Sequence, residues 1–185
     1  YVDEFRDAEM VWRQLADLRQ MVTRRWVIMD VCGGQTHAFL RYGLEAALED
    51  VLEIVHGPGC PVCVTPGEVI DEAIRLAREE GVLLATFGDM LRVPGSRGSL
   101  QSARAEGADV RMVYSPLDSV ALAERNPTRE IVFLAVGFET TVPATVLAIL
   151  QAERRQVANF HVLAHHVRVE PAMRVLLSQA NCRIQ

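Results

Sequence analysis

The most constraining feature of this sequence is a repeated order, in which an apolar strand is followed at once by a short motif with thiol, acidic or imidazole groups. Six predicted strands are followed in this way. The motifs begin at Cys32, Gly57, Phe87, Tyr114, Gly137 and His165. Because the carboxyl ends of parallel strands meet at one edge of a sheet, where ligands bind, the order predicts an α/β fold with a functional edge. Three of the four cysteines fall in these motifs, and thiolates suit iron, copper and zinc.

The alternation of strands and helices predicts two related Rossmann-like domains with mainly parallel sheets flanked by helices. The strands are expected at residues 26–31, 51–56, 82–87, 109–114, 130–136 and 159–164. They are nearly continuous in apolar character, as strands buried on both faces are. The breaker segment at Asn126-Pro127 predicts a boundary. A first domain would then cover residues 1–125, and residues 126–185 would start a second, incomplete domain.

Helices are expected between the strands, and several have a recognisable start. The expected helices cover residues 7–24, 36–48, 66–81, 99–106, 115–125, 143–154 and 171–177. Thr65-Pro66-Gly67-Glu68 predicts a capping box with proline at the first helical position. Ser115-Pro116 predicts the same kind of start for a later helix.

The composition narrows the class of function. The chain has 185 residues, a net charge of −5 and no lysine. It has no block of basic residues interleaved with aromatics, which argues against nucleic-acid binding. It also has no run of about 18 apolar residues, so no membrane-spanning helix is expected. Four cysteines in an α/β chain indicate redox or metal chemistry rather than a disulfide framework, and they predict a cytoplasmic protein.

Three thiols form the strongest candidate site. Cys60 and Cys63 make a C-x-x-C motif directly before a predicted helix, whose positive end should favour the thiolate form. Cys32 begins the preceding strand-end motif and belongs to the same predicted edge. Three thiolates supply part of a tetrahedral metal site, which His37 or His56 would complete. The residues themselves leave the choice between iron and zinc open.

Several other strand-end residues have weaker claims. Asp89 and Glu139 are candidate acid–base or hydrogen-bonding groups, although an acidic residue in such a place is also often a turn or cap residue. Thr140 and Thr141 are candidates to cap the next helix and hold an anion or cofactor there. Cys182 lies outside the pattern, and a structural role is expected for it.

Taken together, these motifs resemble the HypD family of [NiFe]-hydrogenase maturation proteins. The resemblance runs from about Val2 to Leu177. The matching segments are Cys32-Gly-Gly-Gln-Thr-His37, Gly57-Pro-Gly-Cys-Pro-Val-Cys63, Thr86-Phe-Gly-Asp-Met-Leu-Arg-Val-Pro-Gly95, Tyr114-Ser-Pro-Leu-Asp118 and Gly137-Phe-Glu-Thr-Thr141. Many family members have histidine where Gln35 stands, and glutamine forms hydrogen bonds but does not titrate.

The resemblance implies a metallocentre assembly scaffold rather than a free-standing enzyme. HypD proteins work with a small partner, HypC, and receive cyanide from HypE, while a bound iron acquires cyanide and carbon monoxide ligands. The family match assigns iron to Cys32 and Cys63, with His37 as a possible further ligand, and a redox pair to Cys60 and Cys63. The family also carries a C-terminal [4Fe–4S] part. This chain resembles a fragment without that part, so no cluster is expected on it.

Two other functions compete with the scaffold. A thiol-disulfide oxidoreductase would use Cys60 and Cys63 catalytically, which suits a strand, C-x-x-C, helix order. That function leaves Cys32 and its glycine loop without a role. A zinc-binding interaction module would explain the thiols. It would not explain the acidic and threonine motifs at the other strand ends.

Overall fold

A computed structural model describes residues 7–57 and 59–185, which fall into two compact units. Unit 1 combines residues 1–60 with Met173–Gln185, and unit 2 is Pro61–Ala172. The fold class is as predicted, because both units are α/β and every named strand pair is parallel. The units do not follow the boundary expected at residue 126, which lies inside unit 2.

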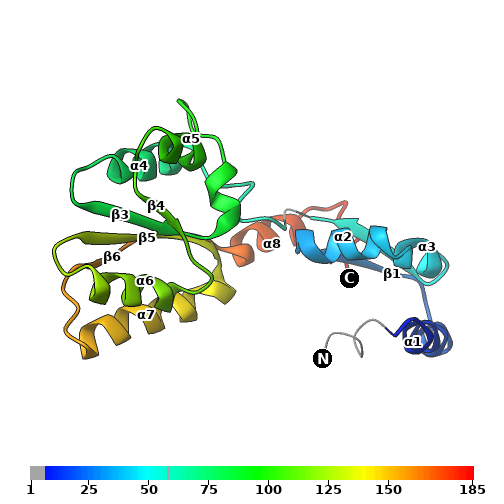
Figure 1. The fold of residues 1–185 in the computed structure, drawn as a ribbon. Coiled ribbons are helices and arrows are strands. Elements are labelled where there is room, and N and C mark those ends of the chain that lie inside the picture. The colour runs from blue at the N-terminus through cyan, green and yellow to red at the C-terminus, as the bar shows by residue number, and fades with distance from the viewer. Residues whose placement is uncertain (1–6, 58) are drawn as a thin grey trace. The chain divides into compact units, whose positions relative to one another are not determined.

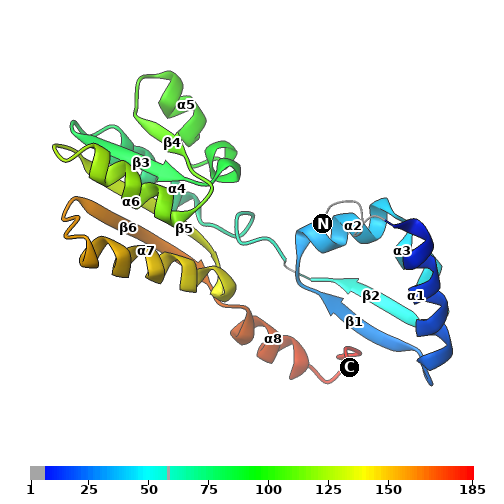
Figure 2. The same cartoon turned by 60° about the horizontal axis from the view of Figure 1, so that its bottom comes forward.

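Unit 1 is built on a two-stranded sheet. Its first five elements are α1 (Ala8–Met21), β1 (Trp26–Asp30), α2 (Gly33–Arg41), α3 (Leu44–Leu48) and β2 (Leu52–His56). The strands β1 and β2 lie side by side, with Asp30 opposite His56 at their carboxyl ends (Figure 2). The single helix expected at residues 36–48 is instead two helices. Gly43, with a φ of 66°, adopts the left-handed conformation that separates them.

The end of the chain packs against this small sheet. Helix α8 (Val169–Leu177) begins in unit 2 and ends in unit 1. The N–H of Gln185 donates to the carbonyl of Val27 over 3.0 Å, and the guanidinium of Arg183 holds both oxygens of Glu53 at 2.6 and 3.0 Å. Two strands alone are marginally stable in water, so these contacts help to hold unit 1 together.

Unit 2 has a four-stranded parallel sheet in the order β4-β3-β5-β6. Its elements are α4 (Gly67–Ala77), β3 (Val82–Thr86), the 3₁₀ helix η2 (Gly88–Arg92), α5 (Leu100–Ala105), β4 (Val110–Met112), α6 (Pro116–Arg125), β5 (Glu130–Phe138), the 3₁₀ helix η3 (Glu139–Thr141), α7 (Val142–Arg154) and β6 (Phe160–Val167). Helices α4 and α5 cover one face, and α6 and α7 cover the other (Figure 1).

The core of unit 2 follows the two-residue period of its central strands. Leu84 and Leu134 face the layer of α4 and α5, where they pack with Ile70. The residues one position earlier, Leu83 and Phe133, face the layer of α6. Strand β3 is buried along its whole length, as its apolar sequence predicts for a strand covered on both faces.

The predicted helix starts have different outcomes. Ser115 and Asp118 form the reciprocal capping box of α6, and proline occupies the first turn, which confirms the prediction there. The capping box predicted at Thr65 is wrong. Helix α4 starts after Pro66 without a side-chain cap, because the Thr65 hydroxyl donates to the carbonyl of Pro61 over 2.9 Å instead.

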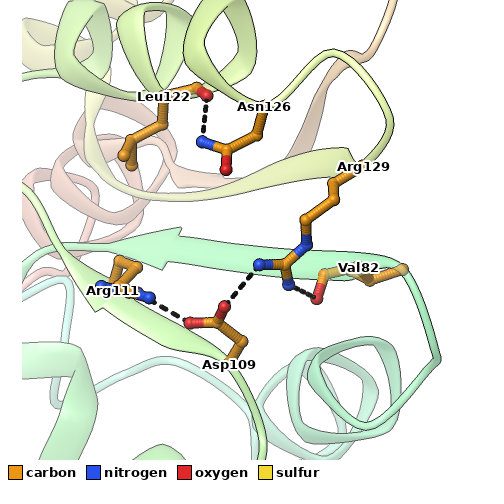
Figure 3. Close-up of polar contacts among 6 residues, drawn as sticks. All are labelled: Val82, Asp109, Arg111, Leu122, Asn126 and Arg129. Carbon is orange, nitrogen blue, oxygen red and sulfur yellow. Dashed lines mark hydrogen bonds and ion pairs between the residues drawn. The ribbon is translucent and has the colours of Figure 1, made fainter.

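A polar network ties together the amino ends of three strands in unit 2 (Figure 3). Arg129 donates to Asp109 over 2.7 Å and to the carbonyl of Val82 over 2.8 Å, while Arg111 donates to the other oxygen of Asp109 over 2.7 Å. Burial acts to raise the pKa of Asp109, but the hydrogen bonds from the two arginines outweigh it and lower the pKa. The side chain of Asn126 donates to the carbonyl of Leu122 over 2.8 Å.

No helix among the described residues is long and apolar enough to cross a membrane.

Candidate functional site

Cys32 occupies the turn between β1 and α2. It is the N-cap residue of α2, with extended backbone angles, and its side chain makes no capping hydrogen bond. The cysteine is exposed, and the two glycines that follow open the helix. A side chain added at Gly34 would meet the Cys32 sulfur at 3.8 Å, so glycine leaves the space beside this thiol open. The turn therefore presents a soft donor at a strand end.

A buried carboxylate that the sequence analysis did not single out supports this turn. Asp30 ends β1 and is only 8% exposed. Its Oδ1 accepts the N–H of Cys32 over 3.0 Å, and its Oδ2 accepts the hydroxyl of Thr36 over 2.6 Å. The signal was an acidic residue at the end of an apolar strand, two positions before the cysteine. Such a residue is buried only when it is hydrogen-bonded.

The second cysteine loop packs directly against the first within unit 1. The N–H of Gly57 donates to the carbonyl of Asp30 over 2.8 Å, and the N–H of Gly33 donates to the carbonyl of Gly59 over 3.1 Å. A Cβ built on Gly59 would lie 2.5 Å from the amide nitrogen of Cys32. The loop leading to Cys60 and the turn at Cys32 are thus held backbone to backbone, as expected for neighbouring strand ends. Residue 58 lies outside the described residues.

Cys63 lies near the start of unit 2, which begins at Pro61. It is exposed and lies in the turn at residues 61–64, just before α4. Val62 anchors this turn by packing against the core layer of α4. His37 and Gln35 are exposed on α2. Among the described residues, no three histidine, cysteine or acidic side chains lie close enough together to hold a metal ion.

The acidic and threonine residues predicted for the site lie in unit 2. Asp89 is exposed in η2. The Glu139 carboxylate accepts the N–H of Val169 over 2.8 Å, at the first residue of α8. The hydrogen bonds from the backbone of Val169 and from its own backbone lower the pKa of Glu139. Thr140 is exposed, and the hydroxyl of Thr141 donates to the carbonyl of Phe138 over 2.8 Å.

One motif that the sequence placed after a strand lies within that strand, and another begins within its strand, because β5 continues through Gly137 and Phe138. His165 and His166 belong to β6, opposite Val136 and Gly137 of β5. The parallel pairing of β5 with β6 continues through these positions, which is why the strands run further than their apolar segments. Burial, and then the neighbouring His165, lower the pKa of His166.

Comparison with known proteins gives a consistent family. The sequence profile HypD, described as "Hydrogenase formation hypA family", matches residues 7–185. The chain is 47% identical to the hydrogenase maturation factor HypD of Rhodobacter capsulatus, over 100% of the chain and 51% of that protein. It is 46% identical to HypD of Escherichia coli K12 (97% of the chain, 50% of the relative) and 51% identical to HypD of Azotobacter vinelandii (99% and 49%). The chain spans about half the length of these curated relatives.

Proposed function

The chain belongs to the HypD family of hydrogenase formation proteins, and from this premise we propose that it serves hydrogenase maturation as part of a metallocentre assembly scaffold. Its relatives are named hydrogenase maturation factors. Because the chain spans about half of their length, the substrate and partners below are proposed for a polypeptide that contains this sequence.

The proposed substrate is ferrous iron, bound by the thiolates of Cys32 and Cys63. Two features support Cys32. Its side chain is exposed, and it makes no hydrogen bond as an N-cap, so the sulfur is available to a metal. Cys63 is exposed in the turn before α4. Thiolates suit iron(II) that also carries carbon ligands, and His37 is a further candidate ligand.

The proposed redox pair is Cys60 and Cys63. Only the dithiol form of this pair offers thiolates to a metal, so a switch between dithiol and disulfide would couple iron loading to the redox state of the pair. The turn at residues 61–64 supports this role, because it holds the chain bent between the two cysteines.

The proposed partners are a small HypC-like chaperone and a HypE-like cyanide donor. With them, the iron would acquire two cyanide ligands and one carbon monoxide ligand in the cytoplasm. Asp89 is the best placed candidate for proton handling, because it is exposed. The carboxylate of Glu139 already accepts the first N–H of α8, and the hydroxyl of Thr141 donates a hydrogen bond to the carbonyl of Phe138. We therefore propose a positioning role for these two, and leave Thr140 as the candidate anion contact.

The test is iron retention by the chain co-purified anaerobically with a HypC-like partner. Cys32→Ala and Cys63→Ala should each lose the iron, while the matched control Cys182→Ala should keep it. Circular dichroism spectra of all three variants should equal that of the wild type. Full iron loading of Cys32→Ala with a native spectrum would refute the assignment.

Elemental analysis separates the alternatives. Iron with infrared bands of bound cyanide and carbon monoxide supports the scaffold. Zinc instead of iron supports a zinc-binding module. Absence of metal together with disulfide reductase turnover that depends on Cys60 supports an oxidoreductase.

A further inference from the structure

Asp30 stands out because of where it is buried. Among the described residues of unit 1, only Leu48 and Asp30 are buried, at 3% and 8% exposure. Burying a carboxylate is unfavourable unless hydrogen bonds compensate for the lost water. A charged residue at one of the two most buried positions of a small unit therefore needs an explanation beyond packing.

The side chain of Asp30 makes the hydrogen bonds at the start of α2 that an N-cap side chain usually makes. The N-cap residue is Cys32, whose thiol makes no capping hydrogen bond. Asp30 instead accepts the N–H of Cys32 over 3.0 Å and the hydroxyl of Thr36 over 2.6 Å. These two bonds clamp both sides of the first turn of α2. The sulfur of Cys32 is consequently left out of the hydrogen bonding that fixes its own backbone.

Asp30 also joins this turn to the second cysteine loop. Its backbone carbonyl accepts the N–H of Gly57 over 2.8 Å. Opposite it in the sheet, His56 places Nδ1 4.0 Å from Oδ2 of Asp30, and Nε2 of His56 lies 3.3 Å from Oε2 of Glu45. Asp30 therefore contacts the start of both loops. Its side chain accepts from Cys32 in the first loop, and its backbone carbonyl accepts from Gly57 in the second.

We infer that Asp30 is a positioning residue. Its two hydrogen bonds fix the turn at Cys32, so that the thiol stays exposed beside the loop that carries Cys60 and is accessible to a thiophilic metal ion. The role requires two acceptor–donor contacts, not negative charge. Asparagine provides them as well, because its oxygen accepts the N–H of Cys32 and its amide donates to the Thr36 hydroxyl. Alanine provides neither.

Hydrogen exchange at the Cys32 amide measures this clamp without any metal. In the reduced, ¹⁵N-labelled chain, this amide should be protected from exchange with solvent, because it donates a hydrogen bond to the carboxylate of Asp30. Asp30→Ala should speed its exchange by about tenfold or more, and Asp30→Asn should remain within about threefold of the wild type. Asp50→Ala is the matched control, since it removes an exposed aspartate of the same unit that pairs with Arg19. It should leave the Cys32 amide unchanged.

Iron retention is the second measurement, and only this one rests on the proposed function. Asp30→Ala should lose iron as Cys32→Ala does, and Asp30→Asn should keep it. An unprotected Cys32 amide in the wild type would overturn the inference even if Asp30→Ala failed to fold. Equal iron loss in Asp30→Asn and Asp30→Ala would also overturn it, because charge and not positioning would then matter. If Cys32→Ala keeps its iron while the exchange pattern is as expected, the iron assignment fails and the clamp stands.

Discussion

Adding one methyl group at Gly59 should separate the two cysteine loops of unit 1. A Cβ there would lie 2.5 Å from the nitrogen of Cys32 and from the carbonyl carbon of Val31, and 2.7 Å from the carbonyl oxygen of Val31. Carbon atoms pack at about 3.5–4.0 Å, so the backbones must move apart by roughly 1 Å. All the atoms in the way are backbone atoms, which cannot rotate aside. We expect Gly59→Ala to lower the free energy of unfolding of unit 1 by about 1–3 kcal/mol, as other overpacked sites do.

Gly33→Ala is the matched control for this prediction. The same substitution on the facing loop meets its nearest atoms, the Cys60 Cβ and the Gly59 carbonyl, at 3.9 Å, an ordinary contact. Gly33 is also the first residue of α2, where alanine is favoured over glycine by up to about 1 kcal/mol. Gly33→Ala should therefore be neutral or slightly stabilising, opposite in sign to Gly59→Ala.

Tryptophan fluorescence during urea unfolding measures the effect in unit 1 alone. Both tryptophans of the chain, Trp12 and Trp26, belong to this unit. The fluorescence midpoint should fall for Gly59→Ala and hold or rise for Gly33→Ala. A Gly59→Ala midpoint equal to that of the wild type would show that the loops are not packed backbone to backbone, and the argument for the paired thiol loops would fail.

Four further predictions concern other features of the chain. Arg129→Met should lower stability by about 1–3 kcal/mol in a denaturation followed by circular dichroism. The substitution removes the side-chain donor to the Val82 carbonyl and one of the two arginine donors to Asp109, which leaves only Arg111. The folded-state pKa of Asp109 is lowered, so its stabilisation is present at neutral pH and is lost as the pH falls through that pKa, a loss that Asp109→Asn should reduce. The pKa of Glu139 is lowered in the same way, so Glu139→Gln should flatten the acid side of the stability profile. Reconstituted with iron and sulfide, the isolated chain should show no stoichiometric [4Fe–4S] absorption at ~400 nm. Such a centre needs four cysteine ligands. The chain has four cysteines in all, and three of them are assigned to the proposed iron and redox site.

The sequence predicted the fold class well because the period of the apolar residues survives in the structure. Strands β3 and β5 are buried where their sequences are continuously apolar, and α6 begins at the Ser115 capping box. The division into units was not predictable in the same way. The breaker at Asn126-Pro127 is the turn between α6 and β5. It does not separate two domains, because β5 pairs with β3, which precedes the breaker, and with β6, which follows it. Local turn chemistry marks where a chain bends, and it carries no information about which strands pair afterwards.

The candidate site was predictable in its thiols and not in what holds them. Glycine and cysteine at strand ends indicate a backbone that approaches something closely, and Gly59 against Cys32 is such an approach. Asp30 gave a weaker signal. An acidic residue at a strand end is ordinarily read as solvated, and only the structure shows that it is buried and that both of its oxygens are occupied.

Glu139 is a second residue whose surroundings only the structure shows. Its place after an apolar strand, within Gly137-Phe-Glu-Thr-Thr141, made it a candidate for acid–base chemistry. In the structure its carboxylate accepts the first N–H of α8, the helix whose later residues belong to unit 1. A carboxylate at a helix amino end is stabilised by the helix dipole as well as by the hydrogen bond, so it favours the ionised form and a fixed helix start. The hydrogen bonds from the backbone of Val169 and of Glu139 itself lower the pKa of this carboxyl in the same sense. The contact that the structure supplies for Glu139 is therefore the amino end of α8, and we expect this carboxylate to fix where that helix begins.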